Sequence, residues 1–138
     1  MIRDDESTCT QWEMWLTPFP RIVGQARRGA RAALTGWDVP AGVVDTTELI
    51  VSELVTNAIR HCDTQHLVHL RVSDDGATLL VEVADPNARH PRPAVPALDA
   101  EGGRGLMLVR AVAAEFGARD RQPVGKTVWA AVSRLPAE

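Results

Sequence analysis

The chain has 138 residues, 45% hydrophobic and 24% charged, which is the composition of an ordinary folded globular domain. Its formal net charge of -3 at pH 7 argues against general electrostatic binding to nucleic acid or to an anionic membrane. Cys9 and Cys62 are too few for a disulfide framework. The charged start of the chain has no apolar signal-peptide core, and no apolar run approaches the ~20 residues of a membrane span. We therefore expect a cytoplasmic protein with no direct nucleic-acid or membrane partner.

The first part of the chain predicts one strand followed by two helices. Residues 1–11 are polar and are expected to form a flexible N-terminus, so that a single domain spans residues 12–138. Alternating apolar residues predict the strand, and apolar residues at helical spacing predict the two helices. The expected elements are a strand over 12–16, a helix over 21–36 and a long helix over 41–62.

The rest of the chain predicts four strands, a long loop and one helix. Residues 86–101 contain four prolines and cannot form regular structure, which is typical of a lid or a binding loop. Gly117 is expected to end the helix that follows this loop. The expected elements are strands over 66–72 and 78–84, a helix over 106–116, and a hairpin of residues 119–121 and 127–132. This order predicts an α+β domain, a two-layer α/β sandwich whose mixed, mostly antiparallel sheet has helices on one face.

Polar side chains follow one stripe of the long central helix. Glu53 and Asn57 are four residues apart, and Arg60 and His61 follow one turn later on the same side. A carboxylate, an amide, a guanidinium and an imidazole therefore line a stripe beside a wide apolar arc. Such a stripe is commonly the solvated face of an amphipathic helix, and the alternative is a site that uses these groups.

Three further segments are candidates for the same site. Residues 102–106, Gly-Gly-Arg-Gly-Leu, open the last helix, and a glycine-rich turn at a helix N-terminus can bind phosphate through free backbone N–H groups. Asp85 ends an apolar strand, where it is either a turn residue or an acceptor for an amine of a nucleotide base. Residues 125–127, Gly-Lys-Thr, are either a hairpin turn or the source of a hydroxyl, on Thr127, near that base.

Together these segments resemble the motifs of the GHKL ATPases, the superfamily of gyrase, histidine kinases and related chaperones. The spacing Glu53-x-x-x-Asn57-x-x-x-His61 resembles the N box of that family. The strand end at Asp85 resembles its first glycine box, residues 102–106 its second, and residues 125–127 its terminal threonine motif. The short length of the chain and the sequences of residues 52–61 and 102–109 are similar to those of bacterial anti-sigma factor serine/threonine kinases. The resemblance covers roughly residues 20–134 and implies the Bergerat ATP-binding fold.

The resemblance implies ATP and Mg²⁺ as ligands and a role for each motif residue. Asn57 would supply a side-chain oxygen to Mg²⁺, and Glu53 would be the general base. Asp85, with Thr127 nearby, would hold the adenine amine. The residues implied to meet or flank the phosphates are Gly103, Arg104, Gly105, Leu106, Arg60 and His61. The resemblance implies a protein kinase that phosphorylates an anti-sigma antagonist protein and also binds a sigma factor. It further implies a homodimer.

One departure from the family pattern leaves a second hypothesis open. The first glycine box of the family reads Asp-x-Gly-x-Gly, whereas this chain has Asp85-Pro86-Asn87-Ala88-Arg89, with neither glycine. Pro86 also biases Asp85 toward an extended backbone. The alternative is a non-catalytic regulatory binding module of the same fold that sequesters a protein partner.

Two other groups of residues have competing interpretations. Cys62, His66 and His69 suggest a metal site, but the two histidines are three apart on an expected strand and would point to opposite faces. The four tryptophans are scattered along the chain, and we expect them to be core residues or partner-facing anchors.

Overall fold

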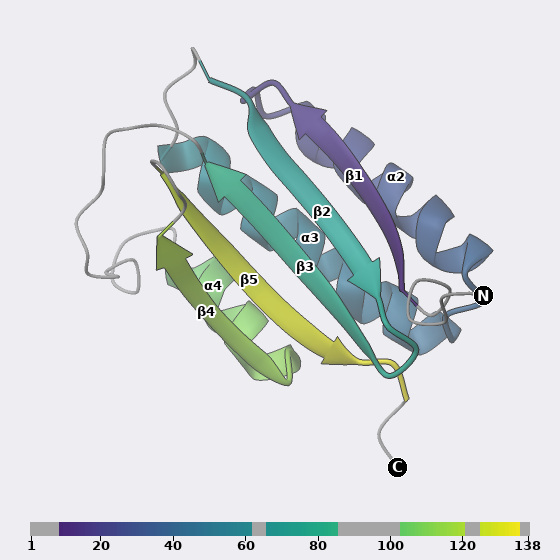
Figure 1. Ribbon diagram of the computed structural model, residues 1–138. Helices are drawn as coiled ribbons and strands as arrows, with labels where there is room; N and C mark the ends of the chain where they lie inside the picture. The colour runs from purple at the N-terminus through teal and green to yellow at the C-terminus, as the bar shows by residue number, and fades with distance from the viewer. Residues whose placement is uncertain (1–8, 62–65, 86–102, 121–124, 136–138) are drawn as a thin grey trace.

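The fold is an antiparallel sheet with the three described helices packed on one of its faces (Figure 1). The computed structural model describes residues 9–61, 66–85, 103–120 and 125–135. The elements in chain order are β1 (Thr10–Leu16), α2 (Ile22–Gly36), α3 (Ala41–His61), β2 (Val68–Asp74), β3 (Thr78–Asp85), α4 (Gly103–Val112), β4 (Glu115–Asp120) and β5 (Lys126–Ser133).

The sheet has five strands in the order β1-β2-β3-β5-β4. Its neighbouring pairs, β1–β2, β2–β3, β3–β5 and β5–β4, are all antiparallel. The predicted two-layer α/β sandwich is therefore confirmed, but the sheet is not mixed as expected. Because β5 enters between β3 and β4, these two strands, which run in the same direction, are not neighbours.

The core lies between the sheet and α3. Side chains alternate between the two faces of a strand, and the inward set on β2 and β3 is buried: Val68, Leu70, Val72, Leu79, Val81 and Val83. The facing residues of α3 are buried as well: Ile50, Val51, Leu54 and Val55. Burying each such side chain stabilises the fold by about 1.5–3 kcal/mol. This packing fixes the rotation of α3 about its axis, and with it the direction of the polar stripe.

α2 packs beside α3, and ion pairs join the two helices at the surface. Arg31 Nη1 lies 3.1 Å from Asp45 Oδ1 and also pairs with Glu48, while Arg27 Nε lies 3.7 Å from Glu48 Oε2. Both arginine side chains are open to solvent, which screens the pairs, so they contribute little to stability. The two arginines therefore belong to the contact between the helices.

The segment after α4 differs from the helix expected over 106–116. α4 begins earlier, at Gly103, and ends at Val112. The chain then joins the sheet, because the backbone N–H of Ala114 donates to the carbonyl of Ala131 on β5 at 2.7 Å. Ala113 and Phe116 fit a helical spacing, but in the structure they pack against the core from β4 and the segment that leads into it. Pairing with the sheet is therefore favoured over a longer helix.

Two glycines are required because a tryptophan ring lies on each of them. Gly117, predicted as a helix stop, is instead a β4 residue opposite Trp129, and a Cβ there would lie 2.9 Å from Trp129 Cζ2. A Cβ on Gly29 of α2 would lie 2.6 Å from Trp12 Cζ2. Both distances are too short for a real contact, so a side chain at either position would displace the ring.

The first strand begins earlier than predicted. Thr10 and Gln11, expected in the flexible N-terminus, lie in β1 and pair with Asp74 and Ser73 of β2. Their backbone hydrogen bonds to a neighbouring strand outweigh their polar character. Residues 1–8 of the expected tail lie outside the described part of the chain.

Candidate functional site

α3 carries its polar stripe toward one end of the sheet. Glu53 is half-buried and Asn57 is buried, whereas Arg60 and His61 are exposed in the last turn of the helix. The stripe therefore runs from the half-buried middle of α3 to its exposed C-terminus. This gradient is not that of a uniformly solvated helix face.

Asn57 carries a buried polar atom that calls for an explanation. The residue is 9% exposed, and no hydrogen-bond donor in the described part of the chain reaches its Oδ1 atom. A buried acceptor without a donor costs about 1–3 kcal/mol, and such atoms in folded proteins usually serve a ligand, an ion or a water. An amide oxygen is a ligand of the kind that Mg²⁺ prefers. The residue therefore fits the ion that the N-box resemblance implies.

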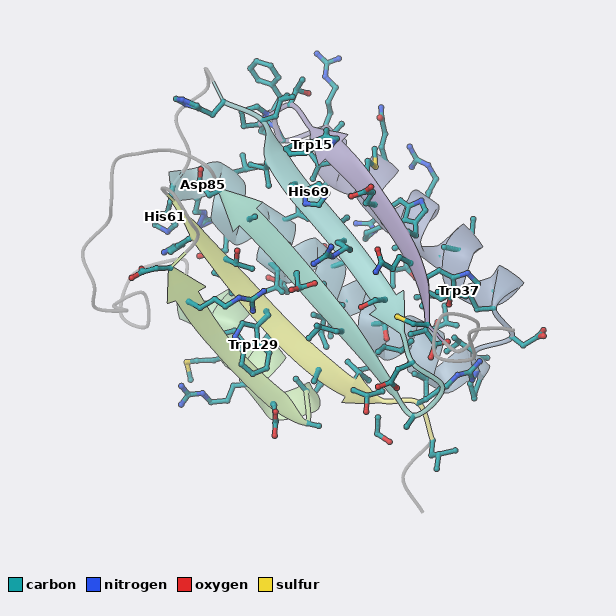
Figure 2. The ribbon with its side chains drawn as sticks, viewed as in Figure 1. Trp15, Trp37, His61, His69, Asp85 and Trp129 are labelled. Carbon is teal, nitrogen blue, oxygen red and sulfur yellow. The ribbon has the colours of Figure 1, made fainter. Side chains whose placement is uncertain are left out.

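Opposite the polar stripe of α3, the candidate site is bounded by the end of the sheet where β3 ends and β5 begins. Asp85 is the last residue of β3, and Lys126, the first residue of β5, lies directly opposite it. Figure 2 shows Asp85 close to His61, the last residue of α3. A carboxylate from the sheet and the basic residues of α3 thus meet at one end of the molecule.

The pKa of His61 is affected by the charged side chains at this end of the sheet. Although the His61 side chain is exposed, the protein around its ring partly desolvates it, and this lowers its pKa below the usual value of 6.5. The positive charges of Lys126 and Arg60 lower the pKa further, whereas Asp85 acts in the opposite direction. His61 is therefore neutral at pH 7. Among the described residues, the permanent cations Lys126 and Arg60 lie at this end, with Asp85 and Asp120 opposite Lys126 on the two neighbouring strands. The cations can attract an anionic group such as a phosphate.

Thr127 does not share a face of the sheet with Asp85. Thr127 is paired with Ala84. Asp85 is two residues after Val83, a core residue, and therefore lies on the same face of the sheet as Val83. Because neighbouring residues of a strand point to opposite faces, Asp85 and Lys126 lie on the helix-covered side and Thr127 points to the other. The position beside Asp85 that we expected for Thr127 is therefore held by Lys126.

Sequence reasoning missed Lys126, although a signal for it was present. The resemblance to the family assigns a role to the threonine hydroxyl of the motif Gly-Lys-Thr and none to its lysine. Once β3 and β5 are paired in register, the residue before Thr127 has the same parity as Asp85. The missing information was the register, which depends on where β5 begins.

The glycine-rich segment forms the first turn of α4. The helix starts at Gly103, so Arg104, Gly105 and Leu106 all belong to its first turn, and α4 packs against α3. The first backbone N–H groups of a helix have no partner within it, and the helix dipole is positive there, so this turn can bind phosphate. The side chains of residues 103–106 and the whole of 86–102, including the expected lid, lie outside the described part.

Other metal sites find no support in the structure. Among the described residues, no group of three or more His, Cys, Asp or Glu side chains could hold a metal ion. His69 lies on β2, with Nε2 at 2.7 Å from Glu13 Oε1 on β1, and Cys62 lies outside the described residues. Mg²⁺ usually keeps several waters and binds substrate phosphates, so an ion held by Asn57 could be completed by a bound nucleotide and water. Within the described ranges, no helix has the length and apolar character needed to cross a membrane.

The face of the sheet opposite the helices is covered by none of the described elements (Figure 1). On this face the buried Glu82 of β3 accepts hydrogen bonds from Arg71 Nε at 3.1 Å and from Arg119 Nη2. Burial alone would raise the pKa of Glu82, but the hydrogen bonds from Arg119 and Arg71 outweigh it and hold the pKa below its usual value of 4.5. The three residues form an ion-paired cluster across β2, β3 and β4.

Two tryptophans lie on this uncovered face. Trp15 is 54% exposed, and its ring centroid lies 4.3 Å from that of His69. Figure 2 labels both side chains, which come from the neighbouring strands β1 and β2. Trp129 is half-buried and lies over Gly117. Trp12, in contrast, packs against the core. The expectation of core residues fits Trp12 and also Trp37, which packs against the same core. That the exposed Trp15 faces a partner stays a prediction.

These features define a class of protein, an α/β domain with a candidate nucleotide site between α3, the first turn of α4 and one end of the sheet. The chain also matches the family model of the histidine kinase-like ATPase domain over residues 16–132. It therefore belongs to the histidine kinase-like ATPase domain family, and membership implies binding of ATP. A comparison with curated proteins found no matching relative. The GHKL resemblance is confirmed at this level, and the likeness to anti-sigma kinases stays a prediction.

Proposed function

We propose that the protein is an ATP-dependent serine/threonine protein kinase that regulates transcription by phosphorylating an anti-sigma antagonist protein. The observation that carries the proposal is the buried amide oxygen of Asn57, without a donor among the described residues, one helical turn from the carboxylate of Glu53. Phosphoryl transfer depends mainly on positioning and on neutralisation of charge. A metal ligand and a carboxylate at this spacing supply both.

The residues of the chain have separate tasks in this proposal. Asn57 would hold Mg²⁺ through Oδ1, and the bound ion would neutralise charge on the phosphates. Glu53 accepts the proton of the attacking serine or threonine hydroxyl. Asp85 accepts a hydrogen bond from the adenine amine. The first turn of α4 and the guanidinium of Arg60 bind the phosphates.

Phosphate transfer from labelled ATP to a candidate antagonist tests the proposal. Glu53→Gln is expected to lower turnover by about 10²–10⁴-fold and to leave ATP affinity within about twofold of wild type, because a general base acts on the attacking group alone. Glu48→Gln is the matched control, since Glu48 lies on the same helix but pairs with α2. Wild-type transfer by Glu53→Gln would show that Glu53 is not the base.

A second candidate function is a non-catalytic module that sequesters a protein partner. Two observations favour it: neither glycine of the family pattern follows Asp85, and the uncovered face carries the exposed Trp15 as well as the paired Arg71 and Arg119. Tryptophan and arginine are enriched at the centres of protein interfaces. Tight binding of a partner without phosphate transfer to any candidate substrate would favour this function over the kinase.

The proposed partners are a sigma factor and its anti-sigma antagonist, with the chain acting as a homodimer in the cytoplasm. They follow from the resemblance to bacterial anti-sigma kinases. A pull-down from the native organism, with and without ATP, identifies what binds. Recovery of neither partner in either condition would count against this assignment.

A further inference from the structure

Lys126 holds a position in the site that the proposed function leaves unused. It is the only lysine of the chain, and it lies directly opposite Asp85 across β3 and β5. Directly opposed residues of an antiparallel pair have Cβ atoms about 4.5–5.5 Å apart and share one face of the sheet. The Lys126 side chain therefore originates beside the carboxylate assigned to the base, on the helix-covered side.

The surroundings of Lys126 fix it at this place. Asp120 lies opposite it on β4, and Arg60 and His61 end the neighbouring helix α3. The charge of Lys126 helps to lower the pKa of His61, which places the ammonium group near the end of α3. Gly125, just before it, is buried with a φ of 98°, a left-handed conformation that favours glycine. The first residue of β5 therefore lies at the same end of the sheet as Asp85 and the end of α3.

We propose that Lys126 is a second base-binding residue, which donates a hydrogen bond to N1 of adenine while Asp85 accepts one from the exocyclic N6 amine. This inference rests on the proposed nucleotide site and adds a residue to it. Adenine presents a donor, N6, and an acceptor, N1, side by side. Asp85 and Lys126 present the complementary acceptor and donor side by side on neighbouring strands.

The chemistry of the two side chains allows both contacts at once. An ammonium group has three N–H donors, and a carboxylate accepts at two oxygens, so the pair can bond to each other and to the base together. Lys126 thereby supplies the second base contact that Thr127 cannot make from the opposite face. A site built around such a donor discriminates against ligands that lack the matching acceptor.

Calorimetry with nucleotide analogues and Lys126→Met tests the assignment. 1-Deaza-ATP lacks the N1 acceptor, whereas 7-deaza-ATP keeps it. Wild type is expected to bind ATP and 7-deaza-ATP alike and 1-deaza-ATP about 10- to 100-fold more weakly, the effect of one charge-assisted hydrogen bond. Lys126→Met is expected to lose the same factor for ATP and little for 1-deaza-ATP. Arg28→Met, which removes an exposed cation from α2, is the matched control and keeps wild-type affinities.

Amine labelling of the wild-type protein tests the same contact without a variant. Because Lys126 is the only lysine, an amine-reactive reagent can modify only Lys126 and the N-terminal amine. ATP is expected to slow labelling of Lys126 and leave labelling of the N-terminus unchanged. At the same occupancy, 1-deaza-ATP is expected to protect Lys126 less than ATP does.

Several results would overturn the assignment. Wild-type ATP affinity in Lys126→Met would mean that Lys126 serves only as a cross-strand partner of Asp85 and Asp120. Equal losses for ATP and 1-deaza-ATP would place the ammonium on the phosphates, and tighter binding of GTP than ATP would mean a different base edge. In the first two cases ATP still binds and the proposed function stands, whereas a preference for GTP would also overturn the contact of Asp85 with the adenine amine. Absence of ATP binding to wild type would overturn both.

Discussion

Replacing Asn57 by leucine is expected to stabilise the free protein and to remove its response to Mg²⁺ and ATP. Asn57 is 9% exposed, and its Oδ1 receives no hydrogen bond from the described part of the chain. An unsatisfied buried acceptor costs about 1–3 kcal/mol, and leucine is better than asparagine within a helix by a few tenths of a kcal/mol. Because the residue is not completely buried, we expect the free energy of unfolding to rise by about 1–2 kcal/mol.

Thermal unfolding with and without Mg²⁺ and ATP measures both effects. For a domain of this size, 1 kcal/mol corresponds to about 3–5 °C in Tm, so the free variant is expected to unfold about 3–10 °C above wild type. A ligand at about 100 times its Kd adds about 2.7 kcal/mol to the free energy of unfolding. Wild type is expected to gain this with Mg²⁺ and ATP, and Asn57→Leu is expected to gain little of it.

Thr47→Val is the matched control for this experiment. Thr47 is also a buried polar residue of α3, but its hydroxyl donates to the carbonyl of Val43 at 2.8 Å and is therefore satisfied. Its replacement is expected to be neutral or slightly destabilising and to keep the response to Mg²⁺ and ATP. A lower Tm for free Asn57→Leu, or a full response of that variant to Mg²⁺ and ATP, would refute the reasoning.

Three further predictions concern the base contact, the ion-paired cluster and a tight packing position. Asp85→Asn is expected to weaken ATP and ADP equally, by about 10- to 100-fold in calorimetry, and an unchanged ADP affinity would contradict the base contact. Glu82→Gln is expected to cost about 1–2 kcal/mol in urea unfolding at pH 7, since its arginine partners are half-exposed. Because the pKa of Glu82 is held below 4.5, this stability is present above pH 4.5 and lost as the pH falls through the folded-state pKa; an equal cost at pH 3 would contradict the cluster. Gly29→Ala puts a Cβ 2.6 Å from Trp12 Cζ2, so it is expected to cost about 1–3 kcal/mol and to change the near-ultraviolet circular dichroism, whereas wild-type stability would mean that the ring moves freely.

The long helix α3 was predictable because its apolar spacing persists over several turns. It runs from Ala41 to His61, and the prediction was residues 41–62. The end of α4 was not predictable in the same way, because the apolar residues after Val112 fit a helix and a short strand alike. They form a strand because they pair with β5, which follows later in the chain, and a local sequence pattern does not reveal this pairing. Gly117 was misjudged for the same reason, since its role is to make room for Trp129.

The candidate site was predictable as a set of residues but not as an arrangement. The spacing of Glu53 and Asn57 follows from helical geometry alone. That no described donor reaches Asn57 Oδ1 depends on the packing of several elements around it, and no sequence pattern carries that information. The exchange of Thr127 for Lys126 beside Asp85 depends on strand register, where a shift of one residue reverses every side chain.

Calorimetric titration of the purified protein with ATP, in Mg²⁺ and again in EDTA, tests the central claim most directly. We predict saturable binding at one site in Mg²⁺, weakened by at least about tenfold in EDTA because the Asn57 oxygen then has no ion to hold. Asn57→Leu is expected to show the weak binding in both buffers. No binding of ATP in Mg²⁺, or equal affinities in both buffers for wild type, would contradict the claim.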